Sequence, residues 1–236
     1  MSSPSSPARG RPARLDRART LQTALDLLDQ SGLDALTMRR LADAMGVQAG
    51  ALYRYFATKQ DLLTAMAERM MEGAAEAAAT ASAATAPAAT ADGGDWSERL
   101  TALARAARSA LLAHRDGARV FAGTHATGES VLGFADAFVG VLREAGFGDD
   151  AAARALYTVV NYTVGHTLEE QAALQAQDGD QEGAGALRDA VAAGTYPHLS
   201  ASLPALTSTD FTGLFEFGLG LIVEGLRARH APPGRK

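Results

Sequence analysis

The stretch Thr37–Lys59, TMRRLADAMGVQAGALYRYFATK, carries small, turn-forming and basic residues in the order that a pair of DNA-reading helices requires. Ala42 stands where two short helices must cross closely. Gly46, four positions later, can adopt the left-handed backbone conformation that ends the first helix. Thr37 is a suitable N-cap for that helix. The pattern predicts a helix-turn-helix whose second helix covers about Gln48–Tyr55.

The flanking segments complete a three-helix unit. Leu15–Ser31 has apolar residues at helical spacing and ends at Gly32. After the helix-turn-helix, Thr58 and Asp61 have the spacing of a capping box that opens a long helix, with apolar side chains expected to point inward at Leu62, Leu63, Met66, Met70 and Ala74. We therefore expect a DNA-binding domain at residues 14–60, which ends inside a helix that runs onward.

Charge is distributed unevenly along the chain. Residues 1–59 hold 9 Lys and Arg against 5 Asp and Glu, whereas the remainder holds 13 against 22. A basic head on an acidic body can bind a polyanion while the body stays away from it, and added salt should weaken that binding. Residues 1–13 are rich in Ser, Pro and Arg and are expected to form a disordered basic arm. The arm either touches the duplex or only aids solubility, and both interpretations fit its composition.

Composition limits the class of protein. With 236 residues, 47% of them hydrophobic, the chain can form the DNA-binding domain and a larger domain at residues 61–236. It has no cysteine, so disulfides and thiolate metal sites are excluded. No apolar run approaches the roughly 20 residues of a membrane span, and the N-terminus lacks the apolar core of a signal peptide. We expect a cytoplasmic protein without membrane contact.

The larger domain is predicted to be helical, so the fold class is all-α. Residues 74–94 are mostly Ala, Thr, Ser, Pro and Gly and are interpreted as a flexible connector. Helical segments follow, among them residues 129–144 and 150–177, and no strand-like alternation persists. The last helix, at about Asp210–Arg229, is too apolar for one buried stripe, and Gly218 and Gly225 would let a neighbour approach closely. We favour a homodimer, although packing within one chain could bury the same residues.

The N-terminal residues resemble the tetracycline-repressor (TetR) family. That family has a helix-ending Gly, then T-x-R-x-L-A-x-x-x-G-V, then L-Y-x-x-F and a Lys. The matching positions here are Gly32, Thr37, Arg39, Leu41, Ala42, Gly46, Val47, Leu52, Tyr53, Phe56 and Lys59. The resemblance implies a homodimeric repressor that binds consecutive major grooves of a palindromic double-stranded DNA operator and is released by a small molecule.

The second domain resembles the tetracycline repressors proper. Residues 111–124, LLAHRDGARVFAGT, are similar to their L-L-x-H-R-D-G-A-K-V-H-x-G-T. Residues 163–171, TVGHTLEEQ, are similar to T-L-G-x-x-L-E-D-Q, and residues 217–222, FGLGLI, to F-G-L-E-L-I. In that family the helices that hold Thr163 and Phe217 form the four-helix bundle of the dimer.

Several departures concern the drug-binding positions. The tetracycline repressors ligate magnesium with a His where this chain has Phe121, and hold the drug with polar residues where it has Ala75, Leu103 and Ala137. Phe121 cannot ligate magnesium. We therefore expect no metal and no cofactor, and an effector that is mainly apolar or aromatic.

Two sets of site residues follow. In the DNA-binding set, Arg39 and Arg54 are expected to contact base edges, and the Tyr and Lys side chains are expected to contact phosphates. Small residues occupy further positions at which the family contacts DNA. The full set comprises Met38, Arg39, Ala49, Gly50, Ala51, Tyr53, Arg54, Tyr55 and Lys59. The effector-binding set is mainly apolar, with Thr124, His166 or Glu169 as polar contacts; it comprises Leu103, Ala107, Phe121, Thr124, Phe134, Ala137, Phe138, Tyr162, His166 and Glu169.

Two other functions remain open at this point. The chain could be a constitutive DNA-binding regulator that has no inducer. It could also be a helical enzyme that uses His166 and Glu169, which are three residues apart on one predicted helix, as an acid/base pair. However, no complete catalytic or phosphate-binding motif occurs in the sequence.

Overall fold

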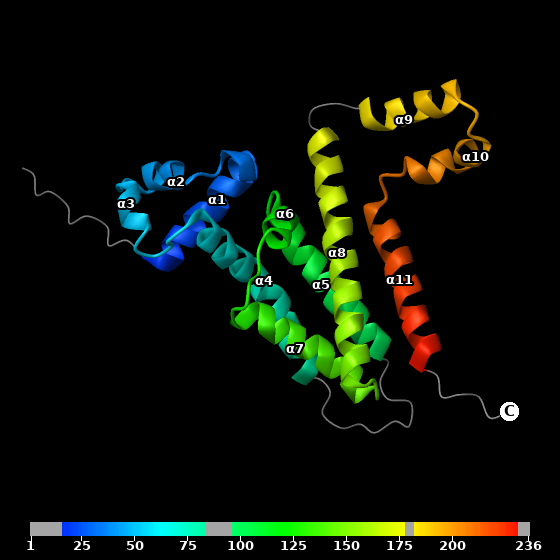
Figure 1. Cartoon of the computed structure of the whole chain (residues 1–236), viewed down its shortest axis with the longest axis horizontal. Helices are drawn as coiled ribbons and strands as arrows, with labels where there is room; N and C mark the ends of the chain where they lie inside the picture. The colour runs from blue at the N-terminus through cyan, green and yellow to red at the C-terminus, as the bar shows by residue number, and fades with distance from the viewer. Residues whose placement is uncertain (1–15, 84–95, 178–181, 231–236) are drawn as a thin grey trace, which may run out of the picture.

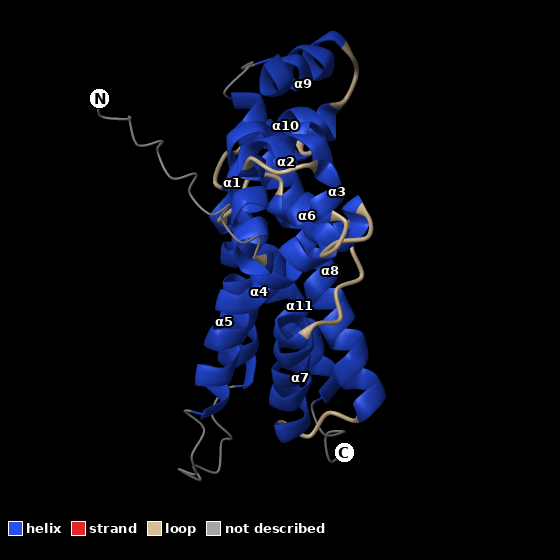
Figure 2. Cartoon of the chain, turned by 90° about the vertical axis from the view of Figure 1, so that its left-hand side faces the viewer, coloured by secondary structure: helices blue, strands red, loops and turns tan. Residues whose placement is uncertain are grey.

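The computed structural model describes residues 16–83, 96–177 and 182–230, and within these ranges it contains eleven α-helices and no strand (Figures 1 and 2). The predicted all-α class is confirmed. The basic arm at residues 1–13 and the later part of the expected connector lie outside the described residues.

The DNA-binding head consists of α1 (Arg17–Ala35), α2 (Met38–Met45) and α3 (Ala49–Leu52). Gly32 interrupts the helical geometry of α1 with a φ of 76°, at the position where the sequence predicts a stop. The Thr37 hydroxyl accepts a hydrogen bond from the Arg40 amide at 3.1 Å, and Gly46 ends α2 with a φ of 68°. The predicted N-cap and left-handed C-cap of α2 are therefore confirmed.

The helix α3 is shorter than the predicted 48–55 segment. After Leu52 the chain forms a turn, in which the amides of Tyr55 and Phe56 both bond to the Leu52 carbonyl. Leu52 and Phe56 are both buried in the head core. The side chains between them are left exposed, so tertiary packing of Leu52 and Phe56 sets the end of the helix.

A single long helix, α4 (Lys59–Ala83), leaves the head and enters the larger domain, here called the body. Its start is a reciprocal capping box, because the Thr58 amide donates to Asp61 Oδ2 at 2.9 Å and the Asp61 amide donates to Thr58 Oγ1 at 3.0 Å. Of the side chains expected to point inward, Leu63 is half-buried and the others are buried. Residues 74–83, which we assigned to the connector, continue this helix, and the buried Ala74 and Ala78 pack in the body core.

The body surrounds the second half of α4. It contains α5 (Trp96–Leu112), α6 (Gly117–Ala122), α7 (Glu129–Glu144), α8 (Asp149–Gln177) and α11 (Phe211–His230). In Figure 1, α8 and α11 lie side by side at the end of the molecule opposite the head, while α9 (Glu182–Ala193) and α10 (Pro197–Leu206) extend beyond their upper ends.

The expectation for the glycines of α11 is partly confirmed. A side chain at Gly218 would collide with the Tyr162 hydroxyl of α8, so this glycine does permit a close helix contact, but within the same chain. Nothing lies within 4 Å of a side chain placed at Gly225. One face of α11 is buried through Phe215, whereas Phe217 is 69% exposed.

Two glycines of the head should respond to alanine in opposite ways. At Gly46, alanine meets no neighbour within 4 Å but must adopt a positive φ, so we expect a loss of about 1 kcal/mol in the free energy of unfolding. At Gly50, which is exposed inside α3, alanine should be neutral or stabilise by up to about 1 kcal/mol. Urea unfolding followed by circular dichroism measures both, and equal effects would contradict the assigned conformations.

Candidate DNA interface and effector cavity

Five of the predicted DNA-binding residues, Arg39, Gly50, Tyr53, Arg54 and Tyr55, are exposed. They belong to α2, α3 and the turn after α3, at the end of the molecule remote from α8 and α11 (Figure 1). Tyr53 and Tyr55 are 50% and 41% exposed, which is unusual for large aromatic side chains, and Arg39 and Arg54 are also exposed. Gly50 is exposed and has open space beside it, so a DNA backbone can approach α3 closely. Guanidinium and phenol groups are therefore exposed around α3, whose own residues 49–51 have small side chains.

One predicted DNA contact requires correction. The Met38 side chain is only 8% exposed and belongs to the head core together with Leu41 and Leu52. As the first residue of α2, it lies on the face that packs on the other head helices, so its side chain cannot reach a groove. Ala49 and Ala51 are half-buried and Lys59 is partly exposed.

The body contains a cavity of about 260 Å³ between α4, α5, α6, α7 and α8, and the exposed Tyr157 forms part of its wall. Its wall is almost entirely hydrocarbon and contains no charged side chain. The lining residues are Met71, Ala104, Ala107, Leu111, Phe121, Ala126, Val131, Phe134, Ala135, Phe138, Leu156, Tyr157, Val159, Val160, Thr163 and Val164. An apolar site of this kind suits a small, mainly hydrophobic molecule.

Four residues of the predicted effector-binding set line this cavity, namely Ala107, Phe121, Phe134 and Phe138. Phe121 replaces the magnesium-ligating His of the tetracycline repressors, and here its ring forms part of the hydrocarbon wall. The apolar interpretation of that position is therefore consistent with its surroundings.

The other predicted apolar contacts lie elsewhere. Leu103 is 2% exposed and fills the body core, and the half-buried Ala137 packs against that core. Thr124 uses its hydroxyl to bond the Phe121 carbonyl at 3.0 Å, which caps the end of α6. The resemblance to the tetracycline repressors placed Leu103 and Ala137 at drug-contact positions, but it could not show which side chains fill the core and which line the cavity.

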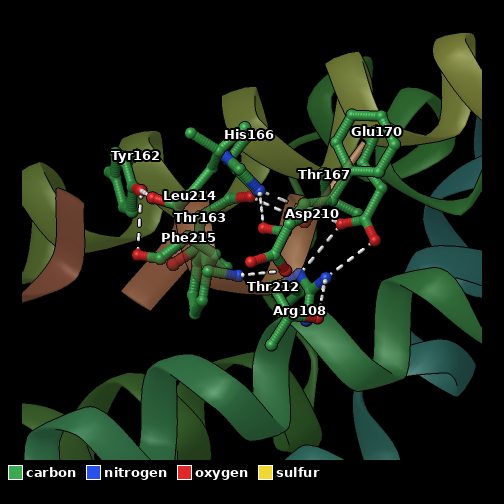
Figure 3. Close-up of polar contacts among 12 residues, drawn as sticks. Arg108, Tyr162, Thr163, His166, Thr167, Glu170, Asp210, Thr212, Leu214 and Phe215 are labelled. Atoms are coloured by element: carbon green, nitrogen blue, oxygen red, sulfur yellow. Dashed lines mark hydrogen bonds and ion pairs between the residues drawn. The ribbon is translucent and has the colours of Figure 1, made fainter. Parts of the chain in front are cut away.

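Tyr162 and His166 occupy the face of α8 that packs on α11 rather than the face toward the cavity (Figure 3). The Tyr162 hydroxyl lies 3.1 and 2.9 Å from the carbonyl oxygens of Leu214 and Phe215, and burial raises the pKa of this phenol. His166 Nε2 lies 2.9 Å from the Phe211 carbonyl oxygen. Both side chains therefore tether α11 to α8.

Glu169 is exposed, and the buried carboxylate of this region is its neighbour Glu170. Glu170 accepts two hydrogen bonds from Arg108 of α5, at 2.7 and 2.9 Å, and the Arg108 guanidinium also reaches the Thr212 hydroxyl at 3.3 Å (Figure 3). Our sequence analysis missed this pair. The available signal was the spacing of Tyr162, His166 and Glu170, four residues apart each time and therefore on one face of a helix.

Polar contacts join the head to the turn before α6 and to α6 itself. Asp29 of α1 accepts from the Arg115 amide at 2.9 Å and pairs with His114, and Asp34 makes a bidentate ion pair with Arg119. The Arg119 guanidinium lowers the pKa of the Asp34 carboxyl through this hydrogen bond.

Asp116 adds a link between head and body. Its carboxylate accepts from the Leu33 amide at 2.8 Å and from Gln175 of α8 at 3.2 Å. Asp116 has a positive φ of 56°, which aspartate tolerates better than most residues. The head is thus attached to the same turn that opens α6, which carries Phe121 of the cavity wall.

The chain matches two family models, described as bacterial regulatory proteins of the tetR family at residues 21–66 and as the tetracyclin repressor-like C-terminal domain at residues 87–230. It is 40% identical over 209 residues to the class A tetracycline repressor of transposon 1721 from Escherichia coli, covering 89% of each protein. The chain belongs to the TetR family.

Two solved structures resemble this TetR protein closely. A possible TetR family transcriptional regulator from Streptomyces coelicolor A3(2) has 71% sequence identity and a TM-score of 0.79, with 91% of this chain and 100% of that one covered. ActR from Streptomyces coelicolor in complex with (S)-DNPA has 28% identity and a TM-score of 0.75, with coverages of 92% and 99%.

Membership in this family decides between the functions that the sequence left open. The protein is a ligand-responsive DNA-binding transcriptional regulator and not an enzyme. The geometry agrees, because Glu169 is exposed while His166 is held by a main-chain carbonyl, so the two do not form an acid/base pair. Among the described residues, no helix is both long and apolar enough to cross a membrane.

Two arginines one turn apart on α5 allow a matched test of the buried ion pair. Replacing Arg108 with Met leaves the 6%-exposed Glu170 without its cationic partner, and we expect the free energy of unfolding to fall by about 2 to 4 kcal/mol. Replacing Arg105 with Met removes a more exposed pair with Glu216 and should cost less than about 1 kcal/mol. Urea unfolding compares the two variants, and equal losses would contradict a buried structural role for Arg108.

Proposed function

We propose that this TetR protein is a homodimeric repressor, released from a palindromic operator when a mainly apolar small molecule enters the body cavity. Residues 14–60 would bind DNA, and residues 61–236 would bind the effector and dimerise. The cavity carries the proposal, because its hydrocarbon wall is contributed by five helices, including α4, which continues from the head. Because the regulator must meet its operator, we place its action in the cytoplasm.

The effector we propose differs from that of the class A relative, whose name identifies it as a tetracycline repressor. A magnesium-bound drug requires oxygen or nitrogen ligands, and Phe121 presents only carbon to the cavity. The remaining wall has no carboxylate or imidazole. We therefore propose an uncharged ligand that binds without a metal ion.

The proposed dimer would use the outer faces of α8 and α11. Tyr157 on α8 is 70% exposed, and on α11 the exposed fractions are 42% for Leu214, 69% for Phe217 and 55% for Leu221. A second copy that pairs these helices with its own would bury this apolar surface and space two heads for half-sites about 34 to 36 Å apart.

A mechanical connection between cavity and head supports regulation rather than constitutive binding. Glu68 of α4 accepts hydrogen bonds from the amides of Ser130 and Val131 in the first turn of α7, a favourable place for a carboxylate. A side chain at Gly128 would collide with Glu68, so the contact requires a glycine there. Because Val131 lines the cavity, a ligand that displaces α7 also displaces α4.

The proposed function is tested by sequencing the genomic DNA that the purified protein retains and then screening small apolar molecules for release of that DNA. We expect one palindromic site to be enriched, with affinity that falls as salt rises. No enrichment over random competitor would refute binding to a palindromic operator, and enrichment without release by any apolar molecule would refute the apolar effector.

Arg39 should contribute sequence preference to this binding. Replacing the exposed Arg39 with Ala is expected to reduce discrimination between operator and random duplex by about 1 to 3 kcal/mol, because a base-edge contact is lost. Competition gel shifts measure the discrimination. Arg154 of α8, an exposed arginine of the body, provides the matched control, and an Ala variant there should behave like the unmodified protein.

Glu68 should couple the effector to the head. The variant Glu68→Ala leaves two amides at the start of α7 without their acceptor, so the effector found in the release screen should act only at several-fold higher concentration. Operator binding without effector should persist. The control is Glu72→Ala, which removes only a surface ion pair with Arg69. Equal half-release concentrations for both variants would exclude this coupling route.

A further inference from the structure

One polar atom at the cavity wall has no partner. Thr163 lines the cavity, is 1% exposed, and its Oγ1 makes no hydrogen bond among the described residues. Burying a hydroxyl without a hydrogen bond costs free energy, and such groups are rare in native proteins.

The usual internal solution is not adopted at this position. Within a helix, a threonine hydroxyl commonly donates to the carbonyl one turn earlier. On the same helix, Thr158 donates to the Arg154 carbonyl at 2.8 Å and Thr167 donates to the Thr163 carbonyl at 2.7 Å. Thr163 makes no such bond to Val159, so its buried hydroxyl remains without a partner at the cavity wall.

Thr163 is also set among purely hydrocarbon neighbours. Val159, Val160 and Val164 surround it on α8, and Phe134 and Phe138 line the wall from α7. The wall has one other hydroxyl, that of Tyr157, whose side chain is 70% exposed, so the Thr163 hydroxyl is the polar group in the buried part of the wall. A charged ligand group would find no counter-charge there and would lose its hydration.

We propose that Thr163 determines effector specificity by hydrogen bonding to a single uncharged oxygen on an otherwise hydrocarbon ligand. The hydroxyl can donate to a carbonyl or accept from a hydroxyl, and a threonine in a helix can adopt two χ1 rotamers, so its hydroxyl can change direction without moving the helix. This inference rests on the proposed function, since it assigns a ligand class to the same cavity.

A pair of probes that differ by one oxygen tests the proposal. Naphthalene and 2-naphthol are suitable in size, because even an apolar cavity of about 150 Å³ accepts benzene. Their dissociation constants are measured by fluorescence titration on the full chain and on the variants Thr163→Val and Thr167→Val. Valine keeps the shape of threonine, so the comparison isolates the hydroxyl.

We expect Thr163→Val to reduce the preference for 2-naphthol over naphthalene by about 3- to 10-fold, the range of one net hydrogen bond. Thr167→Val should leave the preference unchanged. An unchanged preference in Thr163→Val would overturn the specificity role while leaving the apolar cavity intact. Failure of both probes to bind the unmodified protein would instead refute the effector cavity, and this inference with it.

Stability without ligand gives a second readout. Removing an unpartnered hydroxyl should raise the urea midpoint of Thr163→Val, whereas Thr167→Val, which loses a formed hydrogen bond, should have a lower midpoint. A lower midpoint for both variants would show that the Thr163 hydroxyl already has a partner, and would overturn the proposal.

Discussion

The helix α4 belongs to two hydrophobic cores at once, and the rest of the structure depends on this sharing. Leu62, Met66 and Met70 pack in the head core, while Met71 and Ala74 pack in the body core. Close-packed interiors resist small displacements, so a movement of the body end of α4 must be passed to the head or must break packing. The capping box at Thr58 fixes where this shared helix begins and therefore how the head is mounted on it.

The head and the body are also connected through α6. Val120 is buried in the head core, and the next residue, Phe121, packs against both cores and lines the cavity. The Asp34–Arg119 ion pair and the hydrogen bonds of Asp29 to His114 and the Arg115 amide hold the head to this segment from outside. A ligand beside Phe121 therefore acts on head position through α6 as well as α4, but only by the difference in its affinity for the two arrangements.

The sequence predicted best the features that local rules control. The N-cap at Thr37, the left-handed Gly46 and the capping box at Thr58 depend on residues a few positions apart, and all three are present. The cavity was predicted only in part, because the resemblance to the tetracycline repressors indicates which positions lie near the ligand but not which neighbours Phe121 and His166 meet in this chain. That depends on how α8 is rotated between α7 and α11, which tertiary packing alone sets.

A ligand in an apolar cavity changes the conformation of a repressor in a different way from a metal-chelated drug. A metal–ligand bond pulls on one atom, whereas hydrocarbon contacts are individually weak and non-directional, so a ligand can favour one arrangement only by filling its volume better. Phe121 lies at the cavity wall and in contact with both cores, where a difference in ligand size changes the position of α6. Effector selection by such a site therefore begins with size and shape, and a polar group at the wall decides only among molecules that already fit.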